Sequence, residues 1–117
     1  MNYEISVYPE QIAIVRLYGE LGHHETEKIR AQISKTIMQG QVTTLIWNLA
    51  GLQFMDSSGV GLILGRMREL SIVGGQILIL NPSSTMQKIF QFSGLAPYMM
   101  QADEQAAISH IRGIVHG

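Results

Sequence analysis

Residues 43–49 constrain the fold of this chain more than any other segment. They form an almost unbroken run of apolar, β-branched and aromatic side chains, TTLIWNL. Such runs are typical of a β-strand that is covered on both faces, and strands of this kind occur mainly inside parallel sheets. Because parallel neighbours are joined by a crossover, usually a helix, the run predicts an α/β domain with this strand near its centre.

Shorter patterns predict the other elements of that domain. Alternation of polar and apolar residues indicates a strand with one wet face, and apolar residues at every third or fourth position indicate helices. The pattern predicts one domain over residues 1–117, a mixed, mostly parallel sheet with about four helices and right-handed crossovers. In the first half of the chain we expect strands at 3–7 and 12–18 (the second ended by Gly19), a helix at 23–38, the strand at 43–49 and a loop at 50–56. In the second half we expect a helix through 60–70, a strand at 76–80, a helix capped by Asn81 and ended by Gly94, and a short strand at 98–100. The last element is a helix capped by Asp103, with Ala107, Ile108, Ile111 and Val115 facing inward.

Composition excludes several classes of function. Hydrophobic residues make up 46% of the chain and charged residues 15%, which is not the composition of a disordered protein. The formal net charge is -1 and no cluster of lysine and arginine is present, so we expect neither nucleic acid nor a membrane surface as a partner. The chain has no cysteine, no signal-peptide pattern at residues 1–8 and no bilayer-length apolar run. We expect a cytoplasmic protein that is a monomer when free.

Residues 55–61, Met-Asp-Ser-Ser-Gly-Val-Gly, carry the densest polar chemistry of the chain. They follow the predicted central strand, and ligands or partners of open α/β sheets gather beyond the carboxyl ends of strands. Asp56, Ser57 and Ser58 can each accept hydrogen bonds from unpaired N–H groups of the next helix, and capping alone would explain them. Three such residues are more than one helix start needs. Gly59 and Gly61 also leave the backbone beyond them without side chains, so that another molecule can approach it closely. The segment is therefore a candidate binding site.

The spacing in this segment does not fit an enzyme. A nucleophile elbow needs glycine two positions before and after the serine, and neither Ser57 nor Ser58 has both. Gly59, Gly61 and Gly65 imitate a dinucleotide fingerprint whose third glycine comes one position late; the last two can instead let the helix lie close to the sheet. The four histidines form no ligand cluster. We expect no metal, no cofactor and no catalysis, and a small serine hydrolase or nucleotide-binding enzyme remains the alternative of a different class.

Several segments together carry a resemblance to a known family. The most specific is Phe54 to Gly61, and the others span nearly the whole chain: Gly19-Glu20-Leu21, His23-His24, Asn48-Leu49, Ile63-Leu64-Gly65-Arg66, Gly74-Gly75 and Ser93-Gly94-Leu95. In these segments the chain resembles the anti-sigma factor antagonists of the STAS domain family, most of all those of bacillar sporulation.

The resemblance implies a cycle of partner binding and phosphorylation. The unphosphorylated antagonist binds an anti-sigma factor loaded with ATP or ADP, which is also a serine kinase, and so frees the sporulation sigma factor. The kinase phosphorylates the serine after the aspartate, here Ser57, which ends binding, and a serine phosphatase restores it. The partner-binding residues that it implies are Glu20, Leu21, Gly22, His23, His24, Met55, Asp56, Ser57, Ser58, Gly59 and Gly61.

One position departs from the family pattern. Gly22 stands where the family usually has an aspartate, at a helix start near the phosphorylation loop. As a helix cap, glycine costs only a few tenths of a kcal/mol. A charged contact to the kinase is nevertheless not expected at this position. Within the same class, the alternative is an antagonist or scaffold of a stress-response sigma pathway.

Overall fold

The run at residues 43–49 lies at the centre of a mostly parallel sheet, as predicted. The structure, a computed structural model, describes residues 2–116. Within that range five strands lie in chain order, the first pair antiparallel and the others parallel. They are β1 (Asn2–Tyr8), β2 (Ile12–Leu21), β3 (Thr44–Met55), β4 (Gln76–Leu80) and β5 (Met99–Met100).

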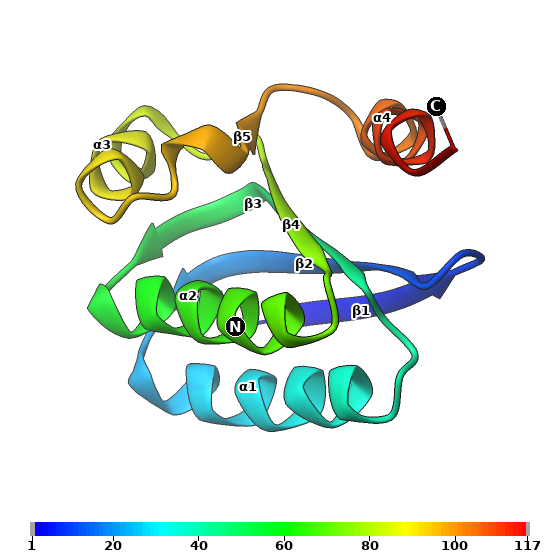
Figure 1. Ribbon diagram of the computed structural model, residues 1–117. Coiled ribbons are helices and arrows are strands. Elements are labelled where there is room, and N and C mark those ends of the chain that lie inside the picture. Colours follow the sequence, from blue (N-terminus) through cyan, green and yellow to red (C-terminus); the bar gives the residue numbers. More distant parts are fainter. Residues whose placement is uncertain (1, 117) are drawn as a thin grey trace.

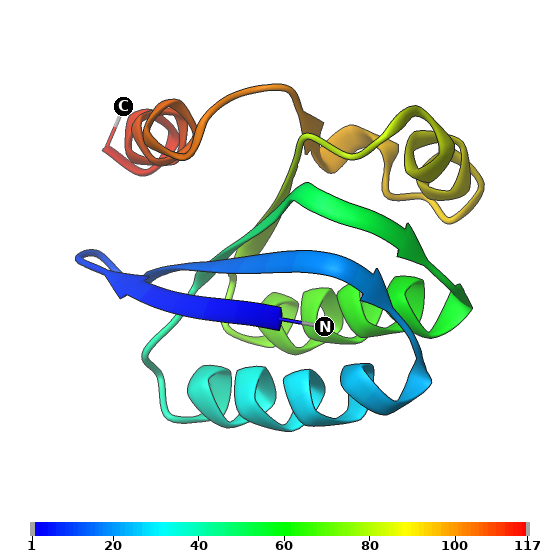
Figure 2. The ribbon, with the colours of Figure 1, turned by 180° about the vertical axis from the view of Figure 1, so that it is seen from behind.

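Helices cover both faces of this sheet (Figure 1). Helices α1 (His23–Met38) and α2 (Ser57–Ile72) lie side by side on one face, and α4 (Glu104–His116) lies on the other. Helix α3 (Ser84–Phe92) and the short 3-10 helix η1 (Ala96–Tyr98) connect β4 to β5. The view from behind shows the same layers, with β1 at the open edge of the sheet (Figure 2). The predicted α/β architecture is confirmed.

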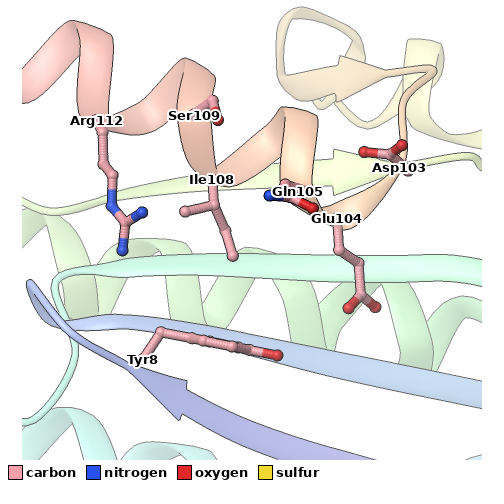
Figure 3. A pocket seen from close by; sticks show the side chains of 7 residues that line it. All are labelled: Tyr8, Asp103, Glu104, Gln105, Ile108, Ser109 and Arg112. Carbon is pink, nitrogen blue, oxygen red and sulfur yellow. The ribbon is translucent and has the colours of Figure 1, made fainter.

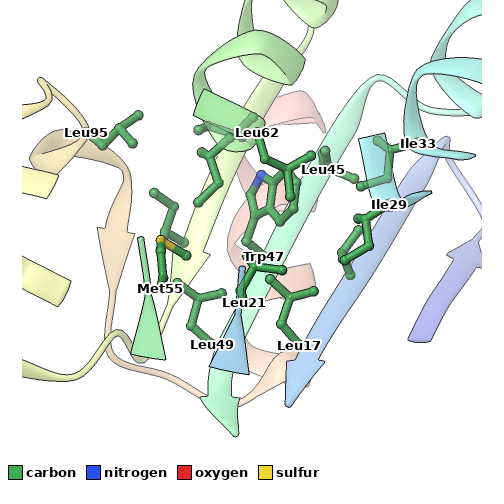
Figure 4. Close-up of a cluster of buried hydrophobic side chains, with 14 of the residues drawn as sticks. Leu17, Leu21, Ile29, Ile33, Leu45, Trp47, Leu49, Met55, Leu62 and Leu95 are labelled. Carbon is green, nitrogen blue, oxygen red and sulfur yellow. The ribbon is translucent and has the colours of Figure 1, made fainter. Parts of the chain in front are cut away.

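The sheet separates two hydrophobic clusters. The larger cluster lies between the sheet and helices α1 and α2 and also includes Met86 and Phe90 of α3. Trp47 is fully buried in it (Figure 4). Alternate residues of the strands point to the other face, where Ile12, Ile14 and Ile46 pack under α4. Residues 44–49 of β3 are thus covered on both faces, which is the physical reason for the unbroken apolar run there.

Helix α4 closes the second cluster largely as predicted. Ala107 and Ile111 are buried there, and Ile108 packs against them. The side chain of Val115, the fourth residue predicted for this face, lies outside the described residues. The predicted cap is also confirmed, because Oδ1 of Asp103 accepts a backbone N–H of the first turn at 2.8 Å.

The predicted cap of α3 is wrong. Ser83, not Asn81, is the N-cap, and its Oγ accepts a backbone N–H of the first turn at 3.2 Å. Asn81 has a left-handed backbone, with φ of 56°, whereas an N-cap residue needs an extended one. Its side-chain amide instead binds the backbone N–H and carbonyl of Ala102, which joins the end of β4 to the segment after β5.

Two strands extend further than predicted, and both extensions lead to the candidate site. Strand β2 continues past Gly19, which has φ of 78° at a register shift against β3, so this glycine bends the strand without ending it. Strand β3 continues through residues 50–55, where a loop was expected. Pairing with β2 holds these residues in the strand, up to the register pair Leu21 and Met55.

Candidate functional site

The ends of β2 and β3 bring two distant segments of the chain together. Their last residues, Leu21 and Met55, are register partners, and the N–H of Asp56 donates to the carbonyl of Leu21 at 3.4 Å. One residue separates each strand from the helix that follows it, so α1 and α2 both begin at this edge of the sheet (Figure 1). The predicted residues 20–24 therefore lie beside the predicted residues 55–61.

Asp56 organises the first turn of α2. It is the N-cap residue, and its Oδ1 accepts the N–H of Ser58 at 2.9 Å and also the hydroxyl of Ser58. Its backbone carbonyl accepts the N–H of Gly59 at 3.0 Å. The hydrogen bond from the Ser58 side chain, aided by the backbone N–H groups and by His23, lowers the pKa of Asp56 below its usual value. The carboxylate is therefore ionised at neutral pH and engaged in capping.

The two serines that follow Asp56 differ in accessibility. Ser57 is the first residue of α2, it is exposed, and its hydroxyl has no hydrogen-bond partner among residues 2–116. Ser58 is half-buried, and its hydroxyl donates to Asp56. The Ser57 hydroxyl is thus free to react or to contact a partner, whereas the hydroxyl of Ser58 is already occupied.

Gly59 provides the close packing of α2 that was expected of Gly61 and Gly65. A β-carbon at Gly59 would lie 2.5 Å from Cγ of Met55 and 3.1 Å from Cδ2 of Leu21. At Gly61 and at Gly65 a β-carbon would meet no atom within 4 Å. The expectation that these two glycines let the helix approach the sheet is therefore wrong. Gly61 instead leaves an exposed stretch of bare backbone about one turn into the helix.

The predicted partner-binding residues fall into three groups by exposure. Glu20, His23, His24, Ser57 and Gly61 are exposed, Gly22, Asp56 and Ser58 are half-buried, and Leu21, Met55 and Gly59 are buried. The buried group fastens the two strand ends to the start of α2. The first two groups form the surface that is open at this edge.

A shallow cavity of about 150 Å³ opens between the starts of α1 and α2. Ser58 and Gly61 line it from α2, and His23 and Arg30 line it from α1, where Arg30 also pairs with Glu27 at 2.9 Å. Arg30 was not among the predicted residues, because its only signal was a place on the polar side of an amphipathic helix. The cavity is smaller than the roughly 300 Å³ at which small-molecule sites begin. Its size and charges suit a side chain of a protein partner.

A larger cavity, of about 660 Å³, lies beside α4 on the other face of the sheet (Figure 3). Each charged side chain that lines it already has a partner, Asp103 as the cap of α4 and Glu104 and Arg112 in ion pairs. Glu104 accepts two hydrogen bonds from Arg16, each at 2.7 Å, and Arg112 lies 3.3 Å from a carboxylate oxygen of Glu10. None of the predicted site residues lines this cavity. By size alone, the cavity beside α4 would be the better candidate for the functional site. The free hydroxyl of Ser57 and the two helices that start beside it instead favour the sheet edge with the two serines.

The described residues form neither a metal centre nor a membrane-spanning helix. Within residues 2–116, no group of three histidine, aspartate or glutamate side chains is placed to hold a metal ion. No helix in the same range combines the length and the apolar character that crossing a bilayer needs. His23 and His24, which begin α1, are both exposed.

Known proteins resemble this chain over nearly its full length. The STAS domain family matches residues 5–107. An anti-sigma F factor antagonist of Lysinibacillus sphaericus is 59% identical over 117 residues, which is 100% of both chains. The anti-sigma factor antagonist SpoIIAA, solved in its unphosphorylated form, is 55% identical with a TM-score of 0.91, over 96% of this chain and 97% of that one. The Bacillus cell fate determinant SpoIIAA, solved in its phosphorylated form, is 56% identical with a TM-score of 0.87, over 95% and 100%.

These likenesses agree with one another and with the geometry of the site. The family match includes both segments that meet at the ends of β2 and β3. The named relatives are regulatory proteins rather than enzymes. The chain belongs to the STAS domain family and, within it, to the anti-sigma factor antagonists.

Proposed function

We propose that this protein is a cytoplasmic binding switch that controls a sporulation sigma factor. In its unphosphorylated form it binds an anti-sigma factor that carries ATP or ADP and that is also a serine kinase, and the sigma factor is thereby released. Phosphorylation of Ser57 by this kinase ends the binding. A serine phosphatase removes the phosphate and restores the antagonist, which acts throughout as ligand and substrate and not as a catalyst.

The observation that carries this proposal is the state of the Ser57 hydroxyl. It is exposed at the start of α2, at the edge where the two predicted segments meet, and it has no partner among the described residues. A kinase can reach such a hydroxyl without opening the fold. Support comes from the relatives, since one at 56% identity has been solved in a phosphorylated form and one at 59% is named an anti-sigma F factor antagonist.

The proposed partner surface surrounds this hydroxyl. Glu20 and the two histidines that begin α1 supply polar contacts on one side. Gly61 supplies bare backbone on the other side, where a partner can approach closely. Gly22, the N-cap of α1, makes no side-chain capping bond, so this position contributes shape and no charge.

A phosphate on Ser57 would act on the complex through its charge. It adds about -1.5 to -2 at neutral pH, next to the ionised carboxylate of Asp56. Two like charges about 4 Å apart in a partly screened interface repel by roughly 4 kcal/mol. Since each ~1.4 kcal/mol changes affinity tenfold, a single clash with the partner's nucleotide phosphates or carboxylates weakens binding about a thousandfold.

Incubation with the cognate anti-sigma factor kinase and ATP tests this proposal. Phosphopeptide mass spectrometry should find one phosphate, on Ser57, and none in the Ser57→Ala variant. The variant is a suitable control because it removes a hydroxyl that makes no hydrogen bond among residues 2–116. A phosphate on Ser58 alone, or turnover of a substrate by this protein without the kinase, would contradict the proposal.

A further inference from the structure

We infer that Asp56 restricts phosphoryl transfer to Ser57 by holding the hydroxyl of its neighbour, Ser58. The inference rests on the proposed function, because it names the residue that gives that reaction its site selectivity. Ser57 and Ser58 are adjacent in the first turn of α2, with α-carbons about 3.8 Å apart. A kinase that brings a γ-phosphate to one of them brings it close to the other, so proximity alone cannot select between them.

The hydrogen bonds of the first turn supply the selection. Oδ1 of Asp56 accepts both the backbone N–H and the hydroxyl of Ser58. To attack a phosphate, the Ser58 hydroxyl would have to leave a charged acceptor, and hydrogen bonds to charged groups are stronger than those between neutral groups. Ser58 is also half-buried against the cavity between α1 and α2. Ser57 has neither restraint.

The same contact could in principle activate Ser58, with Asp56 as a general base. Two observations speak against this role. The hydrogen bonds from Ser58 lower the pKa of Asp56, which makes its carboxylate a poor proton acceptor. Phosphoryl transfer also proceeds through a loose transition state in which positioning contributes more than proton removal. Asp56 is therefore a positioning residue that occupies Ser58.

The reaction that remains is direct transfer to Ser57. Oγ of Ser57 forms a bond to the γ-phosphorus of ATP, and the bond from that phosphorus to the bridging oxygen breaks. ADP leaves with the electron pair, and the proton of the hydroxyl passes to water. No group of this chain has to take up that proton, which agrees with a Ser57 hydroxyl that has no partner among residues 2–116.

Three variants test the inference with kinase, ATP and quantitative phosphopeptide mass spectrometry. Asp56→Gly removes the acceptor while leaving glycine, a well-tolerated residue, at the N-cap. Asp56→Asn keeps a neutral amide oxygen that can still accept a hydrogen bond, and it serves as the conservative substitution. Asp56→Gly combined with Ser58→Ala identifies any new phosphate, and thermal melts establish that each variant is folded.

The expected result is a change of site, not only of rate. Asp56→Gly should raise the ratio of phosphate on Ser58 to phosphate on Ser57 by about tenfold to a hundredfold, the factor that loss of a charged hydrogen bond corresponds to. Asp56→Asn, which keeps a neutral acceptor, should give a ratio between those of the wild type and Asp56→Gly, and the double variant should lose the new phosphate. A merely frayed helix start would slow transfer to both serines without changing their ratio.

Other outcomes distinguish a failure of this inference from a failure of the proposed function. An unchanged ratio in folded Asp56→Gly would overturn the inference while leaving Ser57 as the acceptor. Loss of the Ser57 phosphate in folded Asp56→Asn would also overturn it, because the Asp56 carboxylate would then be required for transfer to Ser57 itself. A wild-type protein that takes up no phosphate on either serine would contradict the proposed function itself.

Discussion

Gly59 and Gly65 have different roles although both lie within α2. Gly59 is buried, and a β-carbon there would meet the side chains of Met55 and Leu21, the last residues of β3 and β2. Gly65 has open space around its missing β-carbon. The first glycine thus sets the distance between the helix start and the strand ends, and with it the place of Ser57. The second glycine only makes the helix less stable than alanine would.

The two positions allow a matched pair of substitutions. Gly59→Ala is expected to lower the free energy of unfolding by roughly 1 to 2 kcal/mol, because its methyl group overpacks the core. Gly65→Ala is expected to raise it by about 0.5 to 1 kcal/mol, because alanine favours the helix and meets no neighbour. Denaturant unfolding of both variants measures the difference. Equal effects of the two substitutions would show that the helix start is not tightly packed at Gly59.

The composition of the site could be predicted from the sequence, but the division of roles within it could not. An aspartate and two serines before an apolar helical stripe indicate a helix start with surplus polar groups. Which serine is occupied depends on side-chain rotamers and partial burial in the folded chain. The same holds for the glycines, since only the contacts of Met55 and Leu21 distinguish Gly59 from Gly61.

At the scale of elements, α4 is held to the sheet by a charged contact as well as by its apolar face. Nε and Nη2 of Arg16, in the middle of β2, donate to the two carboxylate oxygens of Glu104, each at 2.7 Å. Asn48 donates to the same carboxylate at 2.7 Å. The side chains of Arg16 and Glu104 are 17% and 26% exposed, so water screens this pair less than a surface ion pair.

Glu104→Gln is expected to lower the free energy of unfolding by roughly 1 to 2 kcal/mol at pH 7, since it removes the charge from these hydrogen bonds. The hydrogen bond from Arg16, with that from Asn48, lowers the pKa of Glu104 below its usual value of 4.5. The contribution of the pair is therefore complete above about pH 4.5 and is lost as the pH falls through the lower pKa of the folded state. Unfolding measured at pH 7 and near pH 3 should show the two proteins converging in acid. If the difference in unfolding free energy between the two proteins were the same at both pH values, the ion pair would not hold α4 to the sheet in this way.

Elements with a strong local pattern were predictable, and those held by distant contacts were not. The loop expected at residues 50–56 is mostly strand, yet Ala50, Gly51 and Gln53 are exposed and interrupt the apolar pattern. Pairing with β2 keeps them extended, and a local window cannot register such pairing. Gly19 likewise has the signal of a strand end but lies at a bulge within β2.

At the scale of the whole molecule, the reactive serine lies outside the two hydrophobic clusters, although Leu21 and Met55 beneath it belong to the larger one. Ser57 is at the rim where β3 ends, and it belongs to neither cluster. A helix start also accommodates an anion, by about 0.3 to 1 kcal/mol, which offsets the nearby charge of Asp56. The fold resembles relatives solved in the unphosphorylated and in the phosphorylated form, with TM-scores of 0.91 and 0.87.

Phosphorylation of Ser57 is therefore expected to leave the fold unchanged. The melting temperature should shift by less than about 5 °C, which corresponds to about 1 kcal/mol for a domain of this size. Backbone amide NMR shifts should move only near residues 55–61 and 21–24. Shifts that spread through the sheet or into α3, or a large fall in melting temperature, would make the switch conformational.

Titration calorimetry with the nucleotide-loaded anti-sigma factor tests the central claim most directly. It compares the unmodified protein, the protein phosphorylated on Ser57, and Ser57→Ala as the uncharged control. The unmodified protein and Ser57→Ala should bind with similar affinity, and the phosphorylated protein should bind about a thousandfold more weakly. Equal binding by the phosphorylated and unmodified proteins would contradict the account, because charge at Ser57 would then not be the switch.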